Sequence, residues 1–281
     1  MNKLKMAIVG HGFVGNAVDY GFPDNKCDKI IIDPKYGNTV EDLSDEHIDV
    51  SFVCVPTPMG ETAEIDSTIL INTIDSLLKY TTGIIAVKST VTPSIISRYN
   101  TEPRLVYNPE FLTERAACDD FVNPFMHVFG GEPESTAALE RIYQDFSICK
   151  QCVAYHVTLD EASFIKYGIN SFLAAKVLFF NQLYDMTEKY GSNYNVVRNA
   201  IGTDPRIGSS HTMVPGPDGR KGFGSACFSK DCPAFVMFAR DINADFTVLE
   251  EVVRRNQDYR NKYGDVLPRE KQQNVKFDYK I

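Results

Sequence analysis

The segment from residue 221 to residue 231 places a cysteine in a polar setting. It reads Lys-Gly-Phe-Gly-Ser-Ala-Cys-Phe-Ser-Lys-Asp, so that Cys227 ends a glycine-containing loop and Lys230 follows it closely. We expect Cys227 to lie at the start of a helix, where the positive helix end and Lys230 would stabilise a thiolate nucleophile. A buried, inert thiol is the commoner role of a cysteine, but the glycines and charged neighbours favour a reactive one.

Two pairs of polar side chains occur at a spacing of four residues. Lys166 and Asn170 lie in a long helical pattern, and this spacing puts them on one helix face. A partly buried ammonium group beside an amide suits a developing oxyanion, although a surface lysine is the commoner case. Glu110 and Glu114 follow a predicted strand in Asn-Pro-Glu-Phe-Leu-Thr-Glu. If that segment is helical, the two acids can hold a water and take its proton; the alternative is a solvated helix start.

A glycine-rich turn near the N-terminus has the pattern of a dinucleotide-binding loop. It joins a predicted strand to a predicted helix, and its candidate cofactor residues are Gly10, Gly12, Phe13, Val14 and Gly15. The first glycine permits a tight turn, the second lets a pyrophosphate approach, and the third allows close helix packing. Asp33 ends the next predicted strand, where it would bind the ribose hydroxyls and favour NAD over NADP. Lys35 keeps NADP open as an alternative.

These residues need a scaffold, and the first 155 residues alternate strand and helix patterns. Short apolar runs predict buried strands at residues 6–9, 30–32, 50–55, 84–87, 105–107 and 127–129. Helical patterns lie between them, mainly at 13–20, 68–78 and 133–146. This alternation predicts an α/β fold, in which a Rossmann-like, doubly wound parallel sheet forms an NAD-binding domain over residues 1–155.

The pattern then becomes helical, and we expect a second, helical domain over residues 156–281. Its main feature is an uninterrupted helical pattern at 159–189, long enough for a spine between domains or subunits. Shorter helices are expected at 195–200, 233–240 and 246–261, with a glycine- and proline-rich loop at 202–224. The last dozen residues are charged and are expected at the periphery.

Composition argues against several other classes of protein. The 281 residues carry a formal net charge of −8, so no basic field is present to attract nucleic acid. No apolar run approaches the roughly 18 residues that cross a bilayer, and we expect a cytoplasmic protein without a membrane segment. Seven cysteines, an odd number, suit reduced thiols. Cys149 and Cys152 have a metal-ligand spacing without further ligands nearby, and no metal is expected.

Several segments together resemble the motifs of the UDP-glucose/GDP-mannose dehydrogenase family. They are Lys-Ser-Thr-Val at 88–91, Asn-Pro-Glu-Phe-Leu-Thr-Glu at 108–114, the pair Lys166 and Asn170, Asp-Pro-Arg-Ile-Gly at 204–208, and Gly-Phe-Gly-Ser-Ala-Cys-Phe-Ser-Lys-Asp at 222–231. They follow the family's order and cover residues 1 to about 262. The resemblance implies a Rossmann-like domain, a helical central domain and a homodimer formed through the helix at 159–189.

The resemblance also implies a reaction. Two NAD molecules would oxidise the primary alcohol of a nucleotide sugar, UDP-glucose above all, to a uronic acid through a thioester. The catalytic residues carried over are Thr90, Glu110, Glu114, Lys166, Asn170, Cys227 and Asp231. Besides the glycine turn, Asp33 and Lys35, the residues expected at the cofactor are Thr57, Thr90, Glu114 and Lys230. Those expected at the substrate are Glu110, Phe111, Leu112, Lys166, Asn170, Arg206, Phe223 and Gly224.

Three departures from the family pattern affect these expectations. Ser225 stands where the family usually has a second glycine, and a Cβ there can strain the backbone. Residues 211–220 are an insertion, from which Arg220, together with Lys221, could replace part of the phosphate contacts. The chain also stops before the third α/β domain that helps family members to bind the nucleotide. We therefore leave the sugar open, and also whether a separate chain supplies that domain.

Two other functions stay open at this point. A 3-hydroxyacid dehydrogenase of the 6-phosphogluconate type also pairs a Rossmann domain with a long helix that carries a lysine, and it transfers one hydride without a cysteine. A non-catalytic NAD-binding paralogue is the third possibility. The presence of Cys227, Lys166 and Asn170 argues against it, because a decayed enzyme should have lost some of these residues.

Overall fold

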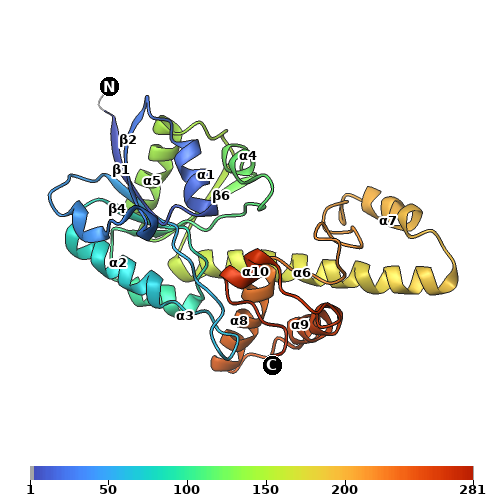
Figure 1. Cartoon of the computed structure of the whole chain (residues 1–281). Helices are drawn as coiled ribbons and strands as arrows, with labels where there is room; N and C mark the ends of the chain where they lie inside the picture. Colours follow the sequence, from blue (N-terminus) through green and yellow to red (C-terminus); the bar gives the residue numbers. More distant parts are fainter. Residues whose placement is uncertain (1–2, 281) are drawn as a thin grey trace. The chain divides into compact units, whose positions relative to one another are not determined.

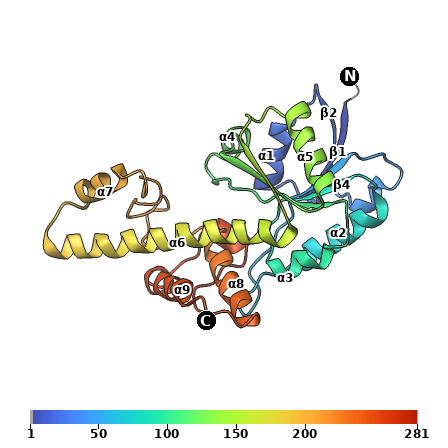
Figure 2. The same ribbon diagram turned by 180° about the vertical axis from the view of Figure 1, so that it is seen from behind.

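The structure is a computed structural model that describes residues 3–280, and its internal contacts divide the chain into two compact units (Figures 1 and 2). The first unit runs to Thr57 and resumes from Asp66 to Lys166. The second unit holds Pro58–Ile65 and the chain from Tyr167 onwards. The division falls at residue 166, inside the long helix, whereas the sequence pattern changes at residue 155.

A seven-stranded sheet forms the centre of the first unit. Its strands are β1 (Leu4–Val9), β2 (Cys27–Ile32), β3 (Val50–Val53), β4 (Ile84–Val87), β5 (Leu105–Tyr107), β6 (Met126–Gly130) and β7 (Val153–Val157), in the order β2-β1-β3-β4-β5-β6-β7. Neighbouring strands are parallel except β5 and β6, because the chain re-enters the sheet from the edge at which β5 leaves it. The expected α/β sheet is confirmed, but it is mixed rather than wholly parallel.

Helices cover both faces of this sheet. One face carries α1 (Phe13–Gly21), α4 (Ala117–Val122) and α5 (Pro133–Phe146), and the other carries α2 (Thr68–Tyr80) and the short α3 (Pro93–Ile96), as Figure 1 shows. Successive strand residues point to opposite faces. Ala7 and Val9 therefore belong to the core beside α2, whereas Met6 and Ile8 belong to the core beside α1. Burial on both faces explains why the strands appear as continuous apolar runs.

The strand register brings five chain segments to one edge of the sheet. The last residues of five strands are Cα partners in neighbouring pairs: Val9, Ile32, Val53, Val87 and Tyr107. The residues that follow them leave the sheet at its carboxyl edge, where ligands bind in open α/β sheets. The glycine turn, Asp33 and the segments 88–91 and 108–114 all start there.

The second unit is helical, as expected. It contains α7 (Tyr194–Thr203), α8 (Phe228–Asp241), α9 (Thr247–Arg260) and α10 (Pro268–Gln272), together with the greater part of α6 (Leu159–Tyr190). The sequence suggested two helix starts in this region, Cys227 and residue 233, and the second is wrong because Pro233 lies inside α8. A proline lacks the N–H that a helix interior uses, so its position in the sequence indicated a helix start.

The C-terminal residues belong to the fold of the second unit, so the expectation of a peripheral tail is wrong. Val275 is buried, and Tyr279 packs against the apolar core of the unit. The Asn274 side-chain amide donates to the carbonyl oxygen of Met59 at 2.8 Å, and the Met59 N–H donates to the carbonyl oxygen of Gln273 at 2.9 Å. The end of the chain thus holds the Pro58–Ile65 segment in place.

Three general features concern the described part of the chain. None of its helices combines the length and the apolar character that a membrane span requires. None of the seven cysteines, all of which lie within residues 3–280, takes part in a disulfide. No group of three or more histidine, cysteine or acidic side chains in residues 3–280 is arranged to hold a metal ion.

Candidate functional site

The glycine turn after β1 has the backbone that a dinucleotide requires. Gly10 has a φ of +89°, and a Cβ there would lie 2.6 Å from the carbonyl oxygen of Cys54. A Cβ on Gly15 would overlap the carbonyl oxygen of Gly10, so α1 can approach β1 only with glycine at this position. A Cβ on Gly12 would meet no atom within 4 Å. The turn is therefore open at Gly12, where a pyrophosphate would reach the N–H groups at the start of α1.

Asp33 connects the end of β2 to this turn. Its carboxylate accepts hydrogen bonds from the backbone N–H of His11 at 2.7 Å and of Lys35 at 3.0 Å. Partial burial acts to raise the pKa of Asp33, but the two hydrogen bonds prevail and hold the pKa below its usual value. The Lys35 ammonium donates to the carbonyl oxygen of His11 at 2.6 Å. An ionised carboxylate beside the turn is what recognition of ribose hydroxyls requires.

Four other residues expected at the cofactor or at the chemistry belong to this unit. Phe13 and Val14 are the first residues of α1 and adjoin the glycine turn. Thr57 and Thr90 are buried in the loops that follow β3 and β4. All four therefore lie in loops or at a helix start on the carboxyl side of the strands.

The segment 108–114 is an extended loop, so the two acids in it do not share a helix face. Pro109 fixes its own φ and disfavours a helical conformation in the residue before it, and the chain therefore leaves β5 extended. Glu110 is buried, whereas Glu114 lies in the exposed turn that precedes α4. Glu110 and Glu114 could hold one water between them only if they shared a helix face, and this segment is not helical.

Lys166 is fully buried, more so than the partly buried lysine considered from the sequence, and it is paired with Glu110. Its ammonium donates to the carbonyl oxygen of Glu110 and, at 3.0 Å, to the Glu110 carboxylate. The other carboxylate oxygen accepts the N–H of Leu112 at 2.6 Å. The ring of Phe111 lies 5.3 Å from the ammonium nitrogen. Each charge thus has several partners, which a buried ion pair needs in order to offset desolvation.

Cys227 lies at the N-cap of α8, which confirms the predicted helix start. Its carbonyl oxygen accepts the N–H of Asp231 at 2.8 Å, so Asp231 follows one helical turn later. Cys227 is partly exposed, whereas Cys232 in the same helix is buried, and burial raises the pKa of the Cys232 thiol. Of these two thiols, Cys227 has the exposure and the helix N-terminus that favour a reactive thiolate.

A chain of buried polar side chains accompanies Cys227. The side-chain amide of Asn170 donates to one carboxylate oxygen of Asp231 at 2.8 Å, and the ammonium of Lys230 donates to the other at 2.6 Å. The rings of Tyr167 and Phe235 stack with their centroids 4.9 Å apart and fix α6 against α8 at this level. The packing of two helices thus sets the position of Asn170 relative to Asp231.

The loop before Cys227 is anchored through its backbone. The N–H of Gly222 donates to the side-chain oxygen of Asn181 at 3.0 Å. Phe223 exchanges two hydrogen bonds with the side chain of Asn256, at 2.7 and 2.9 Å. Asn181 and Asn256 come from α6 and α9, so two helices hold two successive residues of the loop.

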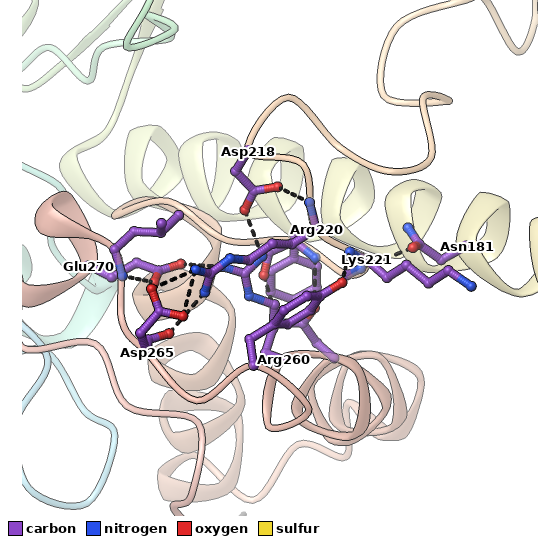
Figure 3. A network of polar contacts seen from close by, with 12 residues as sticks. Asn181, Asp218, Arg220, Lys221, Arg260, Asp265 and Glu270 are labelled. Carbon is purple, nitrogen blue, oxygen red and sulfur yellow. Dashed lines mark hydrogen bonds and ion pairs between the residues drawn. The ribbon is translucent and has the colours of Figure 1, made fainter.

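Arg260 completes this anchoring network. The guanidinium is buried and donates to Asp218 at 2.6 Å and to Glu270 at 2.7 Å (Figure 3). A Cβ on Gly224 would lie 2.5 Å from the guanidinium, so the loop backbone runs directly against it. Sequence reasoning missed Asn181, Asn256 and Arg260, because polar residues in helical patterns usually face solvent and carry no signal of a buried role.

Arg220, the last residue of the insertion, and its neighbour Lys221 are already paired with carboxylates. Arg220 contacts Asp265 at 2.8 Å, and Lys221 contacts Asp185 at 2.6 Å. Both basic residues lie within the network drawn in Figure 3. A substrate phosphate would have to compete with these carboxylates for either cation.

The remaining predicted residues differ in their surroundings. Ser225 has a φ of +67°, which confirms that this position takes the conformation that glycine favours. The Arg206 side chain is 87% exposed and pairs with Asp204. The Phe223 side chain lies in the apolar core of the second unit, whereas Gly224 is half-buried. Of these, Arg206 has the exposure that a substrate contact requires.

Sequence profiles of one family match most of the chain. The profile described as "UDP-glucose/GDP-mannose dehydrogenase family, NAD binding domain" matches residues 37–147, and the profile of the central domain of the same family matches residues 160–258. The first match makes NAD the cofactor of the sheet domain. The open Gly12 and the ionised Asp33 fit it.

Curated relatives and solved structures agree with these matches. UDP-glucose 6-dehydrogenase of Rickettsia typhi is 34% identical over 222 residues, which are 75% of this chain and 50% of that protein. UDP-glucose 6-dehydrogenase TuaD of Bacillus subtilis is 28% identical, over 94% of this chain and 65% of that protein. The chain thus spans about half to two thirds of the length of these relatives.

Two solved structures share the fold. A UDP-glucose dehydrogenase from Pyrobaculum islandicum has a TM-score of 0.78 at 23% identity and is matched over 92% of this chain and 68% of that chain. A 3-hydroxyisobutyrate dehydrogenase from Mycobacterium tuberculosis has a TM-score of 0.71 at 13% identity, over 94% and 96%. Both dehydrogenase classes therefore have this fold, and side chains must distinguish between them.

Gly12→Ala is expected to separate cofactor binding from folding. The added Cβ meets no protein atom, so the free energy of unfolding in urea should change by less than about 1 kcal/mol. The same Cβ would intrude on the pyrophosphate and weaken NAD binding, measured by fluorescence titration, by about tenfold or more, equivalent to about 1.4 kcal/mol. Gly15→Ala is the control and should cost about 1–3 kcal/mol of stability through its overlap. Unchanged NAD affinity in Gly12→Ala would contradict the assignment of this turn.

Ser225→Gly is expected to stabilise the protein. Left-handed backbone costs a residue with a Cβ about 1–2 kcal/mol, part of which the greater flexibility of unfolded glycine offsets. The free energy of unfolding should therefore rise by about 0.5–1 kcal/mol. Ala226→Gly is the neighbouring control and should lower it. A Ser225→Gly variant no more stable than the parent would show that the loop stores no such strain.

Proposed function

We propose that this chain, which belongs to the UDP-glucose/GDP-mannose dehydrogenase family, oxidises the primary alcohol of UDP-glucose to a carboxylate with NAD. The observation that carries the proposal is the position of Cys227, partly exposed at the N-cap of α8 and one turn before the buried Asp231. Oxidation beyond an aldehyde needs a nucleophile that captures the carbonyl carbon, and a helix N-terminus stabilises the thiolate that does so.

UDP-glucose is proposed because the curated relatives that match the chain are named UDP-glucose 6-dehydrogenase. The exposed Arg206 is the candidate for a contact with the substrate. Arg220 and Lys221 are less suitable for this role, because carboxylates already neutralise both.

The reaction consists of two oxidations and a hydrolysis. The alcohol carbon loses a hydride and its hydroxyl loses a proton, which gives an aldehyde. The Cys227 thiolate adds to the carbonyl carbon, and loss of a second hydride gives a thioester. Water then adds, the carbon–sulfur bond breaks and the thiolate leaves. NAD accepts one hydride in each oxidation, so one alcohol and one water yield a carboxylate, two NADH and three protons.

Four of the polar groups described above have proposed roles in this scheme. Asp231 orients the amide of Asn170, whose second N–H is the proposed donor to the oxyanion of the thiohemiacetal. Lys166, which pairs with Glu110 at 3.0 Å, is the proposed cationic partner of that oxyanion. Glu110 is the proposed acceptor of the proton that water loses during hydrolysis.

The main alternative is a dehydrogenase that transfers one hydride. The fold is compatible with it, since the Mycobacterium tuberculosis enzyme has the same fold at nearly the same length. Such a reaction needs neither a thiolate nor the Asn170–Asp231–Lys230 chain next to it. The presence of these groups, together with the family match, favours the two-step oxidation over both this alternative and a non-catalytic role.

NADH released per UDP-glucose consumed is expected to be two, measured by absorbance and by product analysis. Cys227→Ala should abolish uronic acid formation, with a loss of at least about 10³-fold, because the aldehyde can no longer be captured. Cys118→Ala, which removes another partly exposed thiol, is the control and should keep the parent rate. A ratio of one, or full activity of Cys227→Ala, would favour the single-hydride alternative.

We infer that the chain forms a homodimer through α6. Phe172, Phe179 and Met186 are exposed by 70%, 61% and 68%. Their spacing of seven residues places them on one stripe of the helix, and Tyr190, 88% exposed, lies one turn beyond Met186. A contiguous apolar stripe of this length is unusual on a monomer. The family resemblance makes a second copy of the chain the expected occupant.

Phe172→Asp combined with Phe179→Asp is expected to convert a dimer into a monomer in light scattering. Two carboxylates opposite an apolar stripe would each lose hydration without gaining a partner. Phe125→Asp is the control, because Phe125 is also exposed (65%) but lies in the sheet domain. A parent chain that is already monomeric at micromolar concentration would refute the inference.

A further inference from the structure

Lys88, the first residue after β4, is a buried lysine to which the proposed reaction gives no role. Its ammonium donates to the carbonyl oxygen of Asn108 at 3.0 Å, to the side-chain oxygen of Asn108 at 3.0 Å and to the hydroxyl of Tyr143 at 3.4 Å. An ammonium group has three N–H donors, and these three neutral acceptors use all of them. A neutral amine would leave one acceptor without its donor.

Asn108 forms hydrogen bonds through its backbone and through both polar atoms of its side chain. Its N–H donates to the carbonyl oxygen of Val87 at 2.8 Å, and its side-chain amide donates to that of Val128, also at 2.8 Å. Its side-chain oxygen accepts the Tyr143 hydroxyl at 2.8 Å as well as the Lys88 ammonium. Lys88 is therefore one anchor of the residue at which the segment 108–114 begins.

A second buried ammonium holds the same segment two residues later. Lys166 donates to the carbonyl oxygen of Glu110, just as Lys88 donates to that of Asn108. Pro109 lies between them, has no N–H and has a fixed φ. The backbone from Asn108 to Glu110 is thus a short, stiff piece of chain whose two end carbonyls each face a buried cation.

We propose that Lys88 is a positioning residue, which fixes the Asn108–Glu110 backbone so that Glu110 meets Lys166 in its working geometry. Lys88 reaches neither Cys227 nor a substrate in this scheme and acts through Asn108. The catalytic consequence rests on the proposed function, whereas the effect on the segment 108–114 does not.

Several titratable groups face Lys88 from the elements around it. They are Cys54 after β3, Glu110 after β5, His127 in β6, Tyr143 in α5, Cys149 after α5 and Lys166 in α6. Burial lowers the pKa of Lys88 from 10.5 to about 8, against the opposing effect of Cys54, Glu110 and Cys149. Burial and the Lys88 charge together lower the pKa of His127 to about 4, so His127 is neutral at neutral pH.

The sign of the pH effect on stability follows from the lowered pKa. The folded chain loses the Lys88 proton near pH 8, and the unfolded chain keeps it until about pH 10.5. The penalty of burying the charge is therefore complete below pH 8 and disappears as the pH rises toward 10.5. The urea midpoint of the parent should consequently rise relative to that of Lys88→Met over this interval.

The test compares Lys88→Met with Tyr99→Phe in the full chain. Tyr99→Phe removes another tyrosine hydrogen bond, to Asp75, in which no residue of this segment takes part. Hydrogen exchange of the peptide 108–114 should become at least about tenfold faster in Lys88→Met at pH 7 and stay unchanged in Tyr99→Phe. With UDP-glucose, kcat should fall at least about tenfold while the KM for NAD stays within about twofold.

The alkaline side of the rate profile gives a readout that general destabilisation would not produce. The parent should lose rate above pH 8 as Lys88 becomes neutral, and Lys88→Met should lack this decline. If Lys88→Met does not fold, Lys88→Gln, which keeps an N–H donor, is measured instead. Its hydrogen exchange in 108–114 should be faster than that of the parent, and its rate should lack the decline above pH 8. Parent-like exchange in 108–114, or equal acceleration in Tyr99→Phe, would overturn the proposal. A parent that never oxidises UDP-glucose would reject the proposed function, and the exchange result would still decide the role of Lys88.

Discussion

Parallel pairing in register is the constraint on which the arrangement of the sheet domain depends. Val9, Ile32, Val53, Val87 and Tyr107 lie side by side as the last residues of their strands. The polar residues that follow them therefore lie at one edge of the sheet. A glycine turn, an aspartate and the buried Lys88 come from sequence positions far apart, and the backbone ladder alone brings their starting points together.

The buried charges of the sheet domain show a second regularity, since Lys88, Lys166 and Glu110 are each held by backbone as well as by side chains. Lys166 and Lys88 both donate to carbonyl oxygens of the Asn108–Glu110 piece, and Glu110 accepts a backbone N–H. In the second unit, Arg260 lies against the loop that precedes Cys227. Backbone contacts of this kind fix the path of the chain, whereas an ion pair between two flexible side chains would fix only their ends.

The sequence predicted the sheet well because its strands are buried on both faces and appear as short apolar runs. It predicted the glycine turn and the position of Cys227 because each has a local pattern. Its second suggested helix start, at Pro233, is wrong, since this proline is tolerated inside α8. It also suggested a helix for the segment 108–114, where Pro109 and the contact of Glu110 with Lys166 favour an extended chain. Asn181, Asn256 and Arg260 were missed because their partners are backbone groups or acids distant in the sequence, which no local pattern reveals.

The pairing of Met59 with Gln273 and Asn274 sets an order of events during synthesis. Met59 and Asn274 are 215 positions apart in the sequence. The segment from Asp66 to Lys166, which lies between them in the sequence, belongs to the other unit. A ribosome releases the sheet domain first, so it can complete its core while the Pro58–Ile65 segment still lacks its partner. The helical unit must wait until residue 274 has emerged. Until then, the chain carries a finished NAD-binding domain and an unfinished helical unit.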